Sequence, residues 1–145
     1  MFFAGLYDSW YLYRQIQTFM QISETTIQFI EAHLHDDVRA LALQAQKYPE
    51  VDMDMAVTQI SGRQVAKVKV PSWYETQGLW YPKHLPMEQC SSEATALHKT
   101  SLIKGETLTD LTGGFGIDCS FLSRQFHLTN YVERQSSLCH LAEHN

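Results

Sequence analysis

The sequence predicts an α/β protein, in which a helical N-terminal region is followed by a β-α-β-α unit. Three observations support this fold class. Apolar residues recur at helical spacing through residues 20–104, short strand-like runs replace that spacing after residue 105, and a cluster of glycines separates the first such run from the next helix. This order of elements is typical of the opening of a parallel, doubly wound sheet.

Composition supports a folded, intracellular domain. The chain has 145 residues, 44% apolar and 19% charged, which suffices for the core of one domain. A net charge of −5 argues against nucleic-acid binding over the whole surface but leaves room for a local basic patch. Cys90, Cys119 and Cys139 form no C-x-x-C pair and are odd in number, which favours reduced thiols in a cytoplasmic protein. No apolar run approaches the ~20 residues that a membrane helix needs, so no membrane contact is expected.

Residues 1–19 carry no assignment. The stretch MFFAGLYDSWYLYRQ is aromatic, lacks a basic start and is interrupted by Asp8, which makes it a poor signal peptide. A cleaner pattern begins at Met20. The segment is therefore an N-terminal appendage, a stretch before the true start codon or an N-terminal amphipathic segment.

Four helices are expected before residue 105. Their starts are indicated by residues whose side chains can accept hydrogen bonds from the free amides of the first turn, and their ends by proline. They are 23–35 with Ser23 as cap, 36–48 with Asp36 as cap, 52–69 with Asp52 as cap, and 87–104. Residues 71–86 hold three prolines and a glycine, so they are expected to form a loop.

The last part of the chain predicts a Rossmann-like unit. Its expected elements are a strand at 107–111, a helix at 115–126, a strand at 130–133 and a helix at 136–145. Two strands are too few for a parallel sheet buried on both faces, so the chain is expected to be a truncated piece with an open strand edge. The chain is therefore expected to divide into three parts. Residues 1–19 are unassigned, residues 20–104 form a helical region, and residues 105–145 form the incomplete start of a ligand-binding domain.

The glycine loop after the first strand predicts a ligand site, because it brings backbone amides close to a bound molecule. It lacks the lysine of a phosphate-binding P-loop, and Cys119 stands where a dinucleotide fingerprint has its third glycine. S-adenosylmethionine fits better, since its ammonium and sulfonium suit Asp110 and its ribose hydroxyls suit Glu133. These acids are 133 − 110 = 23 residues apart, one loop-helix-loop-strand unit. A tight turn without a ligand is the alternative.

These residues also carry a family resemblance. DLTGGFGID and YVERQSSLCHLAEHN resemble motifs I and II of class I S-adenosylmethionine-dependent methyltransferases, close to the D-x-T-x-G-x-G-x-D form of an rRNA guanine-N2 methyltransferase family. Residues 20–145 as a whole are similar to bacterial methyltransferases that carry a THUMP-like domain at the C-terminal end. The upstream blocks that add to this similarity are FIEAHLHDDVRALALQAQKYP, QISGRQVAKVKVPSWY and YPKHLPMEQCSSEATALHK.

The resemblance implies roles for particular residues. Glu133 matches the acid that binds the cofactor ribose, and Asp118 matches an acid that caps the next helix or reaches cofactor amides. Gln89, Ser91 and Ser92 match a position that clasps the carboxylate end of the cofactor, with helix capping as the alternative for the serines. The methionine part would be held by Asp110, Thr112, Gly113, Gly114 and Gly116.

The resemblance further implies methyl transfer to a base amine in RNA. Amino-methyltransferases of this class use a later [DNS]-P-P-[YFW] motif, and no P-P dipeptide occurs in this chain. No catalytic residue is therefore assigned, and the chain alone is expected to be inactive. The alternative is a non-catalytic helical module that binds RNA or a partner and has a purely structural glycine turn.

Residues 61–83 predict an RNA contact. Their charge is +3, and aromatic residues interleave with the cations, which suits single-stranded RNA. The alternative is a solvated helix face followed by a loop anchored by its aromatic residues. The candidate contacts are Arg63, Lys67, Lys69 and Trp73.

His33 and Asp37 stand at i and i+4 and would share one helical face, but no third metal ligand accompanies them. No metal site is therefore expected. His33 is expected to form a hydrogen bond between helices.

Overall fold

The computed structural model describes residues 22–145, except for the side chains of residues 84 and 85. The unassigned segment 1–19 lies outside the described residues. By their contacts, the described residues up to Ile60 form one compact unit and Ser61–Asn145 form a second. The residues of helix α4 (Met53–Lys69) fall on both sides of this division. The expected domain boundary between residues 104 and 105 stays a prediction.

The helices of the first unit begin where a side chain accepts a hydrogen bond from a free backbone amide. Ser23 caps α2 (Glu24–Ala32), and Asp52 accepts from the amide of Met55 in the first turn of α4, both as predicted. Helix α3 (Val38–Leu43) is followed by the short 3₁₀ turn η1 (Ala45–Lys47). The core of this unit consists of Phe29, Ile30, Leu41, Ala56 and Ile60.

The predicted cap of α3 is wrong by one residue. The carboxylate of Asp37 accepts from the amides of Arg39 and Ala40, whereas Asp36 Oδ2 lies 2.6 Å from His33 Nδ1. His33 therefore pairs with a residue just beyond its own helix, not across helices as predicted. His33 and Asp37, the two residues considered as a metal-binding pair, thus bond to other groups: His33 to Asp36, and Asp37 to the amides of Arg39 and Ala40.

Two expectations for the middle of the chain are wrong. The predicted loop 71–86 contains α5 (Pro71–Glu75), because proline at the first helical position gives up only an amide that has no helical partner. The predicted helix 87–104 is two helices, α6 (His84–Gln89) and α7 (Glu93–Leu102). Cys90 takes an extended backbone between them, and Ser92 caps α7 by accepting from the amide of Thr95.

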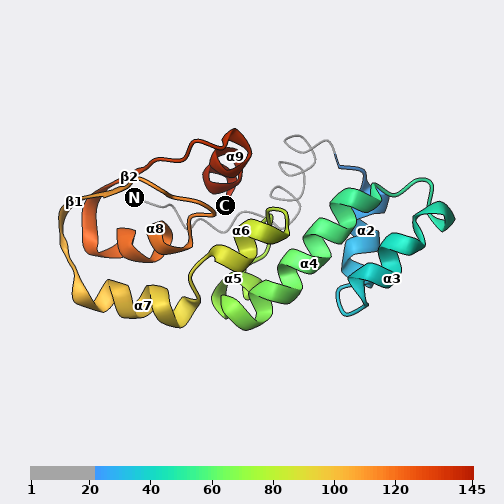
Figure 1. Ribbon diagram of the computed structural model, residues 1–145, viewed down its shortest axis with the longest axis horizontal. Helices are drawn as coiled ribbons and strands as arrows, with labels where there is room; N and C mark the ends of the chain where they lie inside the picture. Colours follow the sequence, from blue (N-terminus) through green and yellow to red (C-terminus); the bar gives the residue numbers. More distant parts are fainter. Residues whose placement is uncertain (1–21) are drawn as a thin grey trace. The chain divides into compact units, whose positions relative to one another are not determined.

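The second unit also holds a parallel two-stranded sheet, so the fold is mixed α/β. Strand β1 (Gly105–Asp110) pairs with β2 (Phe126–Tyr131), with Leu108 opposite Thr129 and Asp110 opposite Tyr131. Helix α8 (Ile117–Leu122) and the turn η2 (Ser123–Gln125) connect the strands, and α9 (Ser136–His144) follows. The predicted order is confirmed, although both strands begin earlier than expected. Figure 1 shows α8 beside the strands and α7 beyond α8.

The core of the second unit joins its helices to the glycine loop. Phe115 from that loop and Phe121 from α8 are almost fully buried. Gly62 in α4 is needed for close packing, since a Cβ there would lie 2.2 Å from the Cβ of Tyr81. The buried cluster consists of Ala66, Val70, Tyr81, Met87, Ala96, Phe115, Ile117 and Phe121.

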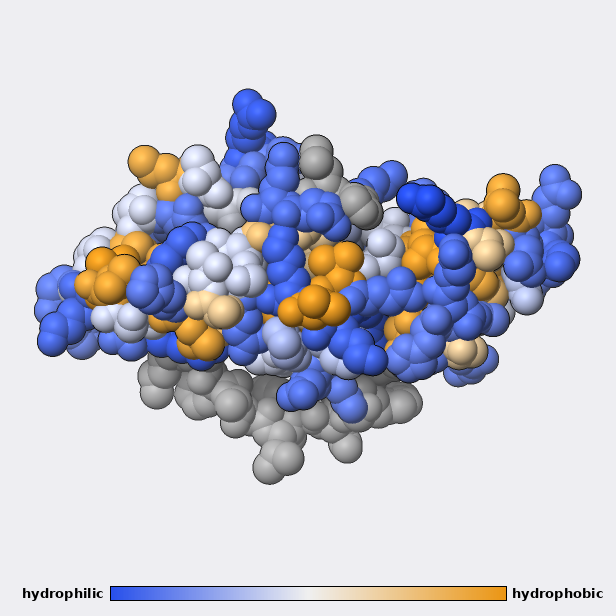
Figure 2. Space-filling view, turned by 60° about the horizontal axis from the view of Figure 1, so that its bottom comes forward, coloured by the Kyte–Doolittle hydropathy of each residue, from blue (hydrophilic) through white to orange (hydrophobic). Residues whose placement is uncertain are grey.

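Apolar side chains also remain on the surface. On the face drawn in Figure 2 they form separate patches among hydrophilic residues. Leu128 of β2 and Val132 just after it are 56% and 47% exposed, and within the described residues each strand pairs only with the other. None of the helices in residues 22–145 is both long and apolar enough to cross a membrane.

Candidate functional site

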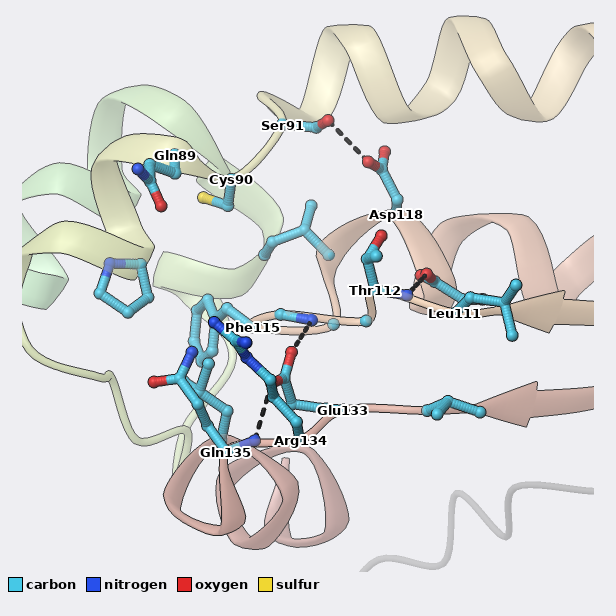
Figure 3. A pocket seen from close by; sticks show the side chains of 18 residues that line it. Gln89, Cys90, Ser91, Leu111, Thr112, Phe115, Asp118, Glu133, Arg134 and Gln135 are labelled. Carbon is cyan, nitrogen blue, oxygen red and sulfur yellow. Dashed lines mark hydrogen bonds between the residues drawn. The ribbon is translucent and has the colours of Figure 1, made fainter.

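A pocket of about 630 Å³ lies at the carboxyl ends of the two strands. It is lined by the turn before α7, by the glycine loop with the start of α8, and by the residues after β2 (Figure 3). Pockets that hold small molecules are commonly 300–1,000 Å³, and open α/β sheets bind their ligands beyond the carboxyl ends of the strands. Position and size therefore make this pocket the candidate site.

The protein's own backbone requires the glycines of the loop. Gly114 and Gly116 have φ of +54° and +89°, left-handed values that disfavour other residues. Gly116 directly precedes α8. At Gly113 a Cβ would lie 2.2 Å from the ring of Tyr131. The glycine at 113 thus makes room for a tyrosine side chain of the next strand.

The glycine loop is fixed from both sides by residues at the end of β2. The Tyr131 hydroxyl donates to the carbonyl of Gly114 at 2.6 Å, and the Gly114 amide donates to Glu133 Oε2 at 3.0 Å. The Gly113 amide donates to the carbonyl of Val132 at 3.0 Å. Both backbone polar groups of Gly114 therefore have partners within the protein.

Both strand-end acids line the pocket. Asp110 Oδ1 accepts from the amide of Thr112 at 3.1 Å. Glu133 Oε1 accepts from the amide of Gln135 at 2.8 Å. This hydrogen bond is the main reason why the pKa of the Glu133 carboxyl lies below its usual 4.5, with the Gly114 amide adding to the effect. Glu133 is therefore an anion at neutral pH.

The turn before α7 forms the opposite wall. Gln89 and Ser91 line the pocket, but Ser92 does not, because its hydroxyl caps α7. Cys90 also lines it and donates its thiol to the carbonyl of Met87, while burial raises the pKa of that thiol. A thiol held in this way is a poor nucleophile at neutral pH.

Asp118 does not cap α8, so the first of its two expected roles is wrong. It lies in the second position of the helix, and its Oδ2 accepts from Ser91 Oγ at 2.8 Å and from Lys99 Nζ at 2.7 Å. Its other oxygen, Oδ1, is buried and has no partner among the described residues. Asp118 therefore faces α7.

The structure thus brings together eight of the predicted binding residues and leaves out Ser92. They are Gln89, Ser91, Asp110, Thr112, Gly113, Gly114, Gly116 and Glu133. Lys99 and Tyr131 lie at the ends of the quoted blocks YPKHLPMEQCSSEATALHK and YVERQSSLCHLAEHN, but the sequence assigned no role to either residue. Strand register is the one signal for Tyr131, since a parallel neighbour of Asp110 must lie beside the glycine loop.

The predicted RNA contacts have other partners in this structure. Lys69 donates to the carbonyls of Met87 and Glu88 and closes the end of α6. Trp73 packs edge-on against Phe115, with 5.2 Å between ring centroids. Lys67 is exposed and lies 5.7 Å from the centre of the Tyr74 ring. The contact with RNA stays a prediction, with Lys67 as its most accessible cation.

The pocket carries negative charge. Asp110, Asp118 and Glu133 line it, against Arg134 as the one cation among the lining residues. This suits a cationic ligand and disfavours an anionic phosphate. Within residues 22–145, no three His, Cys, Asp or Glu side chains are grouped closely enough to hold a metal ion.

A glycine loop after one parallel strand and an acid after the next also occur in open α/β sheets that bind dinucleotides, but the negative charge of this pocket disfavours a phosphate. No protein-family model matches the sequence, and no curated protein matches it. The fold is similar to the crystal structure of a "putative methyltransferase" from Porphyromonas gingivalis W83, with a TM-score of 0.67 and 26% sequence identity. The match covers 91% of this chain and 31% of that one, so the chain spans about a third of that protein's length.

Proposed function

We propose that this chain is the cofactor-binding part of an S-adenosylmethionine-dependent methyltransferase of class I. One observation carries the proposal: Asp110 at the end of one strand and Glu133 just beyond the next line the same pocket as the glycine loop between them. The similarity to a methyltransferase structure supports it.

The acceptor groups of the pocket fit this cofactor. S-adenosylmethionine has two cationic centres, two ribose hydroxyls and no phosphate. A carboxylate has about four acceptor positions. Each oxygen of Glu133 accepts one backbone amide, so positions remain for the ribose hydroxyls. Among the hydrogen bonds of the described residues, the Asp110 carboxylate accepts only one, from the amide of Thr112 to Oδ1. Its second oxygen is therefore available to the ammonium of the cofactor.

Bound S-adenosylmethionine would supply an activated methyl group to a nucleophilic nitrogen. The residues of this chain would bind and orient the cofactor and keep water from one side of it. Phe115 closes the inner wall of the pocket and is 2% exposed. No catalytic residue is assigned in this chain.

The proposed acceptor is a base amine in RNA. This rests on the resemblance to RNA-directed enzymes and on the basic residues of α4. A Lys67→Glu variant is expected to bind a mixed-sequence single-stranded RNA more weakly, with a salt dependence reduced by about one unit of slope. Filter binding across a salt series measures this, with Lys104→Glu as control. An unchanged slope would remove Lys67 from the interface.

The alternative is a helical module with a purely structural glycine turn. The observation in its favour is that Tyr131 and Glu133 already account for the glycines and for both polar groups of Gly114. In that case the turn needs no ligand to explain it.

Calorimetry on the full chain separates the two. We expect saturable binding of S-adenosylmethionine and of S-adenosylhomocysteine, no binding of ATP, and loss of both signals in Asp110→Ala. Glu106→Ala is the matched control, because Glu106 lies on the same strand with its side chain 89% exposed. A folded wild type that binds neither ligand would exclude the proposed function and favour the structural turn.

A further inference from the structure

Lys99 lies in α7 and is not among the residues that line the pocket. Its ammonium donates to Asp118 Oδ2 at 2.7 Å and to Ser91 Oγ at 3.0 Å. Ser91 Oγ donates to the same carboxylate oxygen at 2.8 Å. The three polar groups therefore bond to one another in a closed triangle, and Figure 3 shows its Ser91–Asp118 side.

The triangle connects two walls of the pocket. Ser91 belongs to the turn before α7, and Asp118 belongs to the first turn of α8, two residues after Gly116. Both line the pocket. The distance between the 89–91 wall and the end of the glycine loop is thus fixed through polar groups that meet at Lys99.

Asp118 depends on these two partners. Its Oδ1 is buried without a partner among the described residues, so the hydrogen bonds made by this carboxylate converge on Oδ2. Hydrogen bonds to an ionised group are about twice as strong as neutral ones. Lys99 also offsets one of three negative charges around the pocket.

We propose that Lys99 is a positioning residue of the pocket, which acts through Asp118 and Ser91 to hold the 89–91 wall against the start of α8. Its effect on cofactor affinity rests on the proposed function, whereas its effect on the two walls does not. The competing view is an ordinary surface ion pair, since the Lys99 and Asp118 side chains are 44% and 31% exposed and such pairs contribute little. An ordinary pair would not include a third polar group, here Ser91, that lines the pocket together with Asp118.

Hydrogen exchange on the full chain without ligand tests the positioning role. In Lys99→Met, amides in residues 88–92 and 113–120 are expected to exchange roughly tenfold faster, about 1.4 kcal/mol of lost protection. Lys99→Arg keeps a charged donor and should restore slow exchange. The control Lys104→Met removes an exposed lysine outside the pocket and should change neither segment. Unchanged exchange in Lys99→Met would overturn the inference.

Calorimetry with S-adenosylmethionine tests the consequence. Lys99→Met is expected to bind roughly tenfold more weakly, and Lys99→Arg within about threefold of the wild type, since tenfold corresponds to about 1.4 kcal/mol. Equal affinity of Lys99→Met and wild type would overturn the inference. If the wild type binds no cofactor while Lys99→Met still loosens both walls, the proposed function fails and the positioning role stands. Should Lys99→Met not fold, Ser91→Ala removes two of the three contacts of the triangle and must loosen the same segments.

Discussion

A Glu133→Gln variant is expected to bind S-adenosylmethionine roughly 10- to 100-fold more weakly than the wild type, because charge-assisted hydrogen bonds contribute about 1.5–3 kcal/mol. Glutamine offers one acceptor oxygen where Glu133 uses two, so either the Gly114 amide or the Gln135 amide also loses its partner. The variant therefore weakens the ligand contact and the glycine loop together. Calorimetry measures the first effect and hydrogen exchange of residues 112–116 the second.

Glu106→Gln is the matched control, since it removes the same charge from an exposed position of β1. Its affinity should equal that of the wild type. Undiminished binding by Glu133→Gln would show that this acid is not part of the site.

The loop contact of Glu133 should also resist acid. Its folded pKa is below the usual 4.5, so the stability that this carboxylate contributes is present above the pKa of the unfolded chain. It is lost only as the pH falls through the lowered folded pKa. Protection of the amides of residues 112–116, taken relative to the intrinsic exchange rate at each pH, is therefore expected to persist at pH 4.5 and to fall at lower pH.

The second large effect is expected at Gly113. In Gly113→Ala the new methyl group meets the Tyr131 ring, and moving that ring breaks the hydroxyl contact with Gly114. Overpacking of this kind costs about 1–3 kcal/mol of unfolding free energy. Urea denaturation measures the loss, and we expect cofactor binding to fall with it.

A double-mutant cycle identifies the cause. Once Tyr131→Ala has removed the ring, Gly113→Ala should cost almost nothing more, so the two effects are strongly non-additive. At Gly114 the nearest atom to a Cβ is 3.7 Å away, and the strain comes from φ of +54°. Gly114→Ala should therefore cost the same with or without Tyr131. If the losses of unfolding free energy in Gly113→Ala and Tyr131→Ala simply add in the double variant, the steric explanation is contradicted.

The sequence predicted the order of elements well where local rules decide. Ser23 and Asp52 cap their helices, and β1–α8–β2–α9 follows the expected order, because capping residues and hydrophobic spacing are local signals. Where two local solutions compete, the predictions failed. Asp36 and Asp37 can both cap α3, and a proline can begin a helix as well as end one.

In the candidate site, too, the residues marked by a local signal could be predicted and those that depend on packing could not. Asp110 and Glu133 were predicted because an acid at a strand end is visible in the sequence, and both line the pocket. Lys99 was not, because its partners Ser91 and Asp118 meet it only after α7 and α8 have packed. Packing partners are equally hidden in the sequence for the aromatic residues of the expected RNA contact, which stays a prediction. Trp73 lies between cations in the sequence, as in an RNA-binding surface, but packs against Phe115.

That contact gives the chain an optical reporter of its own. Tryptophan emission depends on the surroundings of the indole, and the indole of Trp73 touches the phenyl ring at the centre of the glycine loop. A shift of the loop would change the surroundings of this indole, so part of the intrinsic fluorescence of the chain records the state of its pocket without any label.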